Sequence, residues 1–200
     1  MGSLTSIQKE VLIGSLLGDG ALRKQGTRTN ALLEVNHSFQ YKEYVDWKWQ
    51  HFKEYIKTPP KPRHGNGNRI AYRFTTQSLP FFTEYYDKYY SNGKKFIAPD
   101  ITLTPLILSV WFMDDGSKSR NTYYLNTQQF SIEDQNCLMS ILDRDLKIKS
   151  SLNRDKIYWR IRIRTESADR FKKIVAPYLL PCFRYKIDND PVTTDSKDEI

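Results

Sequence analysis

Apolar residues recur with helical spacing near the start of the chain. Thr5 and Gln8 have the spacing of a capping box, so the pattern predicts a helix that begins just after Thr5. Gly14 and Gly18 fall on one face of this helix, and because glycine weakens a helix we expect another backbone to approach closely there. The apolar positions that define the helix are Ile7, Val11, Leu12 and Leu16.

A second apolar run, LSVWFMDDG at 108–116, stops at the same dipeptide as the first, LIGSLLGDG at 12–20. Thr104 is the expected N-cap of this second helix, and the proline after it suits the first helical position. Asp19 and Asp115 therefore occupy matched helix ends. A carboxylate at the end of a buried helix is costly without a positive partner, so two of them suggest a shared cation.

The same order of elements follows each of the two helices, so the pattern predicts an α+β protein built from two αββαββα repeats. One alignment of the repeats places Glu34 against Asn126 and Asn36 against Gln128. We expect a first repeat at 5–98, a second at 99–187, and an acidic, disordered tail at 188–200. The predicted elements are 23–30, 32–39, 41–56, 69–75 and 79–90 in the first half, and 117–121, 123–130, 133–146, 157–164 and 168–177 in the second.

The clearest alternation lies at 157–164. Ile157, Trp159, Ile161 and Ile163 are predicted to face the core, and Tyr158, Arg160, Arg162 and Arg164 to face outward. Guanidinium groups two residues apart on a strand repel one another unless an anion covers them, which favours a nucleic-acid surface. A solvated face, the alternative, would more often include Glu or Thr. Arg69, Arg73 and Thr75 form a weaker counterpart in the first half.

The charge distribution agrees with that interpretation. The formal net charge is +8 and the sequence pI is about 9.3, although the tail at 188–200 is strongly acidic. A body this basic favours a polyanionic partner. No apolar run reaches the roughly 18 residues of a membrane span, and no signal or transit peptide is visible, so we expect no membrane partner.

The residues that most often bind structural metals show no such spacing here. Cys137 and Cys182 are isolated, which indicates neither a disulfide framework nor a zinc site. His37, His51 and His64 are likewise expected to be polar contacts or surface residues.

These segments resemble the LAGLIDADG homing endonucleases, in particular the single-chain, two-motif members of the omega-intron type. The resemblance covers nearly all of 6–187, and two motifs at this separation make it specific. It is carried by LTP at 103–105, WFMDDG at 111–116, LNTQ at 125–128, PYLLP at 177–181 and YK at 185–186.

The resemblance implies a fold in which the two motif helices pack side by side at a pseudo-two-fold axis. Each half would contribute a four-stranded antiparallel sheet, and the two sheets would form a saddle over duplex DNA. The candidate DNA contacts on the polar strand faces are Arg23, Arg28, Asn30, Glu34, Asn36, Arg69 and Arg73 in the first half, and Arg120, Asn126, Gln128, Arg160, Arg162 and Arg164 in the second.

The resemblance also implies metal-dependent chemistry. The last acid of each motif, Asp19 or Asp115, is expected to bind divalent metal near the scissile phosphates, with the Gly18 carbonyl as a further ligand. Two or three Mg²⁺ or Mn²⁺ ions would be shared between the motifs and the DNA.

Three further residues are assigned from the same resemblance. Asp114 stands where the first motif has a small residue and is a further metal candidate. Lys95 and Lys186, which close the two halves, are the expected catalytic lysines, with Lys94 as an alternative to Lys95.

These features predict a site-specific endonuclease that cuts both strands of a long, asymmetric DNA duplex. The alternative is an RNA maturase or a relative that binds nucleic acid without cutting; a non-cutting relative tends to lose one motif aspartate, and both are present here. We expect a monomer that acts on double-stranded DNA, with host intron RNA as a further partner. The expected location is intracellular, in an organelle (mitochondrion or chloroplast) or in a prokaryotic cytoplasm.

Overall fold

The first predicted helix is α1 (Ser6–Leu17), and it begins with the expected capping box. The Thr5 hydroxyl accepts a hydrogen bond from the Gln8 backbone N–H (3.2 Å), and the Gln8 side chain accepts one from the Thr5 N–H (2.8 Å). The second motif helix, α4 (Pro105–Asp115), begins at Thr104, whose hydroxyl accepts from the Ile107 N–H. The computed structural model describes residues 3–24, 26, 29–65 and 67–188.

The first half begins with α1, and in chain order one long helix separates the first two strands of its larger sheet from the last two. Its further elements are β1 (Ala21–Arg23), β2 (Leu32–Ser38), η1 (Phe39–Tyr41), α2 (Lys42–Phe52), η2 (Lys53–Tyr55), β3 (Lys61–His64), β4 (Ile70–Thr75), α3 (Pro80–Tyr89), β5 (Tyr90–Ser91) and β6 (Lys94–Lys95).

The second half repeats this order from α4 onward. Its further elements are β7 (Gly116–Ser119), β8 (Thr122–Leu125), α5 (Ile132–Leu146), β9 (Ser150–Asp155), β10 (Tyr158–Ile163), α6 (Thr165–Val175), η3 (Ala176–Tyr178) and η4 (Pro181–Lys186).

The described strands form two larger sheets with the same antiparallel topology. Their strand orders are β1-β2-β4-β3 and β7-β8-β10-β9, and β5 with β6 makes a separate hairpin. The predicted α+β fold with two αββαββα units and four-stranded antiparallel sheets is therefore confirmed.

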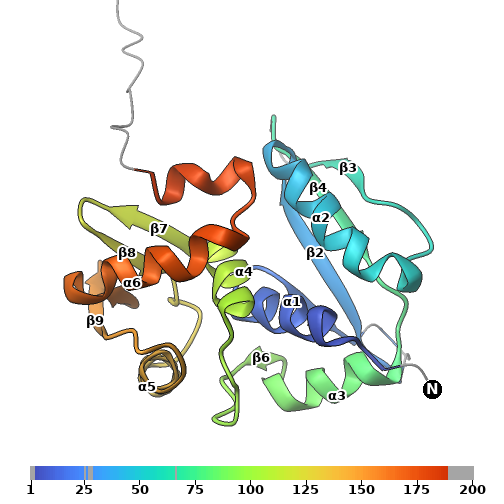
Figure 1. Ribbon diagram of the computed structural model, residues 1–200. Coiled ribbons are helices and arrows are strands. Elements are labelled where there is room, and N and C mark those ends of the chain that lie inside the picture. The colour runs from blue at the N-terminus through green and yellow to red at the C-terminus, as the bar shows by residue number, and fades with distance from the viewer. Residues whose placement is uncertain (1–2, 25, 27–28, 66, 189–200) are drawn as a thin grey trace, which may run out of the picture.

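The motif helices α1 and α4 lie side by side between the two halves (Figure 1). A Cβ atom added at Gly14 would lie 2.6 Å from the Val110 Cβ, and one at Gly18 would lie 2.4 Å from the Asp114 Cβ. The predicted close approach at these glycines is thus present. On α4 every residue from 107 to 113 is buried, so this helix is surrounded by protein at the centre of the molecule.

The register of the two sheets corrects the predicted alignment by two residues. Ala21, two residues after Asp19, pairs with Glu34, and Ser117, two residues after Asp115, pairs with Tyr124. Glu34 and Tyr124 are therefore equivalent, and Val35 matches Leu125. Asn36 therefore corresponds to Asn126 and not to Gln128. Because side chains alternate with a period of two along a strand, this shift leaves the predicted faces unchanged.

Several predicted strands are longer than the observed ones. The strand expected at 23–30 shares only Arg23 with β1, which lies at 21–23, and the one expected at 123–130 is β8, which ends at Leu125. The strand expected at 157–164 begins one residue later, because Lys156 and Ile157 form a two-residue turn between the paired Asp155 and Tyr158.

Ile157 consequently does not face the core and is 76% exposed. Arg164 lies beyond β10 and is the N-cap of α6, so the last member of the predicted arginine row is not on the strand. Within the described residues, no helix is long and apolar enough to cross a membrane.

Candidate active site

The two motif aspartates lie at the ends of the central helices. Asp19 follows Gly18, the C-cap of α1, and Asp115 is the last residue of α4. Partial burial and the Asp114 charge raise the pKa of Asp19. Burial and the charges of Asp19 and Asp114 raise the pKa of Asp115 to about 7. Among the described residues, the Asp115 carboxylate accepts no hydrogen bond, so its acceptor capacity is available to a cation.

The two predicted catalytic lysines lie at these same helix ends, each in its own half. The Lys95 ammonium group, on β6, donates to the Gly18 carbonyl oxygen at 2.7 Å. The Lys186 ammonium group donates to the carbonyl oxygens of Phe112 (3.1 Å) and Met113 (2.8 Å). Burial lowers the pKa of both lysines to about 8, against the opposing effect of the neighbouring aspartates.

Lys94, the alternative to Lys95, lies on the same hairpin but is exposed. Successive side chains of a strand point to opposite faces, so Lys94 points away from the motif helices when Lys95 reaches Gly18. The Gly18 oxygen also accepts a longer hydrogen bond from Gln129, at 3.4 Å. A metal ion bound by this oxygen would therefore compete with the longer contact from Gln129, since a carbonyl oxygen has two lone pairs and Lys95 uses one of them.

Asp114 forms a wholly buried ion pair with Lys48 of α2. The Lys48 ammonium group donates to both carboxylate oxygens, at 2.9 and 3.0 Å, and both side chains are 0% exposed. The same ammonium group lies 4.4 Å from the ring centroid of Tyr44. Lys48 therefore neutralises Asp114, which stands where the first motif has the small residue Gly18.

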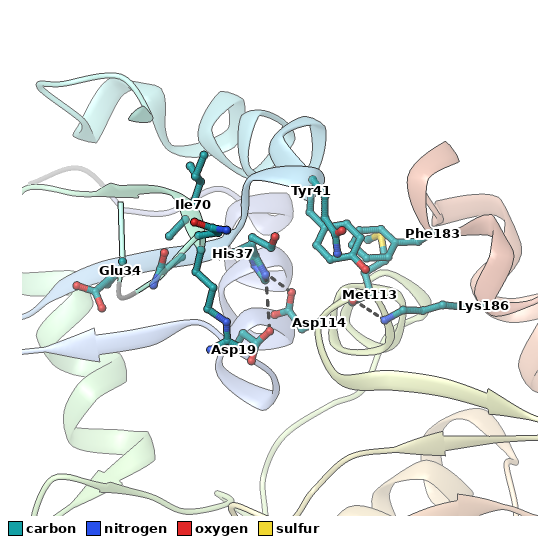
Figure 2. A pocket seen from close by; sticks show the side chains of 16 residues that line it. Asp19, Glu34, His37, Tyr41, Ile70, Met113, Asp114, Phe183 and Lys186 are labelled. Atoms are coloured by element: carbon teal, nitrogen blue, oxygen red, sulfur yellow. Dashed lines mark hydrogen bonds and ion pairs between the residues drawn. The ribbon is translucent and has the colours of Figure 1, made fainter. Parts of the chain in front are cut away.

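His37 of β2 lies between Asp19 and Asp114 (Figure 2). Its Nδ1 is 3.6 Å from an Asp19 oxygen and its Nε2 is 3.5 Å from an Asp114 oxygen, and its side chain is 7% exposed. Burial and the nearby Lys48 charge lower the pKa of His37 to about 4. Of the two sequence-based expectations for His37, a polar contact and a surface residue, the structure agrees with the first, because its side chain is buried against the two carboxylates.

These groups open into a cavity of about 1150 Å³ on the sheet of the first half (Figure 2). Its wall combines residues of both halves, including Asp19, His37 and Arg69 from the first and Asp114 and Lys186 from the second. The helix ends therefore face a space bordered by polar strand residues.

In the first half, most candidate DNA contacts lie on or next to the strands of the sheet. Arg23 forms an ion pair with Glu34 at 2.9 Å across the β1–β2 edge. Asn36 is exposed on β2 opposite Arg73 on β4, and Arg69 is exposed immediately before β4.

Asn30, another first-half candidate, is not on these strands. The Asn30 side chain accepts a hydrogen bond from the Thr83 hydroxyl at 3.1 Å, outside any strand. Arg28 lies outside the described residues.

In the second half, Arg160 is the most strongly positioned candidate. Its guanidinium carbon lies 4.1 Å from the Tyr124 ring centroid, and its Nη1 donates to the Asn126 side chain at 3.3 Å. Within the described residues, the buried Nε atoms of Arg160 and Arg162 have no hydrogen-bond partner. Both side chains are half-buried, so these two Nε atoms are not accessible on the strand face.

The other two second-half candidates lie away from the strands. Gln128 lies in the turn after β8 and donates to Asp155 at 3.1 Å. Arg120 lies in the β7–β8 turn, with a left-handed φ of 47°.

Sequence reasoning missed His37, Lys48 and Gln129. A signal for Lys48 was available, since it shares a helical stripe with Tyr44 and Phe52, and a lysine in an apolar stripe must bury its charge. Nothing local distinguished His37 or Gln129, because their partners belong to distant segments.

Comparison with known proteins supports the same interpretation. Residues 9–171 match the LAGLIDADG DNA endonuclease family. Probable intron-encoded endonuclease 1 from Wickerhamomyces canadensis is 31% identical over 92% of this chain and 85% of its own length. Cytochrome b mRNA maturase bI2 from Debaryomyces hansenii is 30% identical over 90% of this chain and 73% of its own.

A solved structure is similar over almost the whole chain. The homing endonuclease I-WcaI, bound to its DNA recognition sequence, is 28% identical, with a TM-score of 0.87 over 96% of this chain and 90% of that one. The paired motif helices and sheets define a two-motif, single-chain architecture. The chain belongs to the LAGLIDADG DNA endonuclease family, and it is a DNA endonuclease of the homing type.

Proposed function

We propose that the chain cuts both strands of a long, asymmetric DNA duplex, with Asp19 and Asp115 each serving one strand. The observation that carries this proposal is the matched pair of helix ends, each with a carboxylate and a buried lysine. We propose the repeats at 5–98 and 99–187 as the two units. Because these units differ in sequence, they suit a target without exact two-fold symmetry.

The residues at the helix ends fit divalent metal ions. Their donors are mainly carboxylate and carbonyl oxygens, which Mg²⁺ and Mn²⁺ prefer. Burial and the charges of Asp19 and Asp114 raise the pKa of Asp115, so a bound cation would reduce the repulsion between these acids. We propose two or three Mg²⁺ or Mn²⁺ ions held by Asp19, Asp115 and DNA phosphates, with the Gly18 carbonyl as a further ligand. Bound there, such ions would activate water and neutralise the leaving oxygen.

Lys95 and Lys186 are proposed to stabilise the transition state. Each ammonium group is already held by carbonyl oxygens at a helix end, so it need not reorganise when negative charge develops on the phosphate. The partly desolvated position strengthens this electrostatic effect relative to one in water.

The polar strand faces are proposed to hold double-stranded DNA, bound by a monomer. I-WcaI, the homologue of similar fold, was solved on its DNA recognition sequence. The exposed Arg69 and the half-buried Arg160 and Arg162 carry guanidinium groups, which suit phosphate and base-edge acceptors.

RNA maturation is the second candidate function. The relative from Debaryomyces hansenii is named a cytochrome b mRNA maturase, and the same basic faces could contact host intron RNA. The other relative's name, an intron-encoded endonuclease, supports the proposal that an intron in an organelle or a prokaryote encodes this chain.

The deciding experiment is a cleavage screen of a randomised duplex library with Mg²⁺. Wild-type protein should select one long site and cut both strands. The Asp19→Asn or Asp115→Asn variant should bind that site without double-strand cleavage, although nicking is allowed if the sites act independently. Asp100→Asn, at an exposed acid paired with Lys88, is the matched control and should cut normally. Full cleavage by the Asp19→Asn, Asp115→Asn double variant would refute the assignment.

A further inference from the structure

His37 is placed between two groups that can only accept hydrogen bonds. A neutral imidazole has one N–H donor and one lone pair, whereas both neighbouring carboxylates, when ionised, offer only lone pairs. One ring nitrogen therefore faces a carboxylate oxygen with its own lone pair. The two separations, 3.6 Å to Asp19 and 3.5 Å to Asp114, are longer than hydrogen bonds.

One ion binds only one nitrogen of the ring. An ion beside Nε2 would share the 3.5 Å separation with Asp114, and the more exposed Asp19 side chain would have to turn toward it to complete the set. Metal–nitrogen and metal–oxygen bonds of about 2.0–2.2 Å place neighbouring ligands of one ion roughly 3–3.5 Å apart. One ligand atom each from Asp19, His37 and Asp114 lies within 4.8 Å of the others. The His37 side chain is more than nine-tenths buried, and its Nε2 has no hydrogen-bond partner within the described residues.

Asp114 is already oriented for such a role. Lys48 holds both of its oxygens, and a carboxylate has about four lone-pair sites, so further acceptor capacity remains toward His37. The cavity brings solvent to the cluster, because Asp19, His37 and Asp114 all line it (Figure 2).

The second half offers no equivalent set. The sheet register places Thr127 at the position of His37, and the Thr127 hydroxyl is occupied by Gln135 at 2.9 Å. The motif position of Asp114 is Gly18 in the other helix. The mixed nitrogen and oxygen donor set is therefore confined to the side of Asp19.

We propose that Asp19, His37 and Asp114 together bind a divalent cation through one imidazole nitrogen and two carboxylates. The proposal deepens the proposed function, since Asp19 is assigned there to one of the two cleavage sites. Imidazole suits Mn²⁺, Co²⁺ and Zn²⁺ better than Mg²⁺. The Asp19 site should therefore prefer these ions, whereas the Asp115 side should bind Mg²⁺ and Mn²⁺ through oxygen alone.

The first test uses the intact wild-type protein with Mn²⁺ and without DNA. Pulsed electron paramagnetic resonance should detect ¹⁴N coupling from an imidazole bound directly to Mn²⁺. The signal should vanish in His37→Ala and persist in His64→Ala, which removes an exposed histidine of β3 and serves as the matched control. Bound Mn²⁺ without ¹⁴N coupling in wild type would overturn the proposal, whatever the folding of the variants.

The second test compares metal affinities by calorimetry. His37→Ala should weaken Mn²⁺ binding by about tenfold or more and leave Mg²⁺ binding nearly unchanged. Failure of wild type to bind Mn²⁺ at millimolar concentration would mean that Lys48 alone neutralises the cluster, and would also overturn the proposal. Both outcomes differ from failure of the proposed function, because DNA cleavage dependent on Asp19 and Asp115 could persist in either case.

Discussion

Gly18 lies against Asp114 so closely that residue 18 has no room for a side chain. A Cβ at Gly18 would be 2.4 Å from the Asp114 Cβ and 2.7 Å from its Oδ2. Asp114 cannot move aside easily, because Lys48 binds both of its oxygens. Asp114 of the second motif can therefore occupy its position only because residue 18 of the first motif is glycine.

Gly18→Ala should destabilise the protein and reduce cleavage. We expect overpacking to cost about 1–3 kcal/mol in the free energy of unfolding, and the adjacent Asp19 to be displaced. Gly65→Ala is the matched control, because a Cβ there would meet only ordinary contacts, the nearest at 3.5 Å. Denaturant unfolding of both variants checks this, and equal stability of Gly18→Ala and wild type would contradict the packing described.

Lys48→Met should be severely destabilising. It leaves the Asp114 carboxylate buried without a partner, which typically costs about 3–5 kcal/mol. Adding Asp114→Asn should restore part of the loss, because the buried charge is then removed. Lys88→Met breaks the exposed pair with Asp100 and should cost less than about 1 kcal/mol in the same unfolding experiment. Similar losses in the two lysine variants would show that Asp114 is neutralised in another way.

Lys95→Met and Lys186→Met should slow cleavage far more than they weaken DNA binding. We expect about a 10²-fold loss of rate for each, because a preorganised cation near the reacting phosphate is removed. Single-turnover cleavage and binding assays on the same target separate the two effects. If both variants lose only affinity, these lysines are phosphate anchors.

The pH dependence tests the same lysines. Both have a pKa of about 8 in the folded protein, so their ammonium groups are charged below that value and lose their charge as pH rises through it. Cleavage by wild type should therefore fall above about pH 8, and only the variant that carries both Lys95→Met and Lys186→Met should lack this fall. A wild-type rate that rises through pH 8 and is flat in that variant would instead assign the lysines as bases.

Arg160→Ala and Arg162→Ala should relax base preference at single positions of the target. A guanidinium that reads guanine contributes about 1–3 kcal/mol of discrimination, whereas a phosphate contact weakens all sequences alike and lowers the salt dependence by about one charge. Arg164→Ala is the internal comparison, because Arg164 caps α6 and lies off the strand. Binding to single-base variants over a salt series checks this. Uniform losses for Arg160→Ala and Arg162→Ala would mean that β10 contacts only the DNA backbone.

The sequence by itself determined the local architecture. The capping box at Thr5, the N-cap at Thr104 and the small residues at Gly14 and Gly18 all predicted what the structure contains, because each signal depends on neighbours in the chain. The two Asp-Gly helix ends and the repeated element order predicted the two-fold plan for the same reason.

Strand register was decided by the tertiary structure. A shift of two residues keeps every side chain on its predicted face, so hydrophobic alternation could not distinguish Asn126 from Gln128 as the counterpart of Asn36. The end of β10 before Arg164 depends likewise on where the strand pairing stops.

The contacts among the buried polar side chains at the helix ends also depend on the tertiary structure. Lys48 and His37 meet Asp114 only because α2 and β2 of one half lie against the end of α4 of the other. His37 meets Asp19 because β2 lies beside the end of α1. Each of these groups is costly to bury alone and acceptable in combination. Local patterns record which residues are apolar or helical, whereas the partner that makes a buried charge tolerable lies on a segment that only folding brings near.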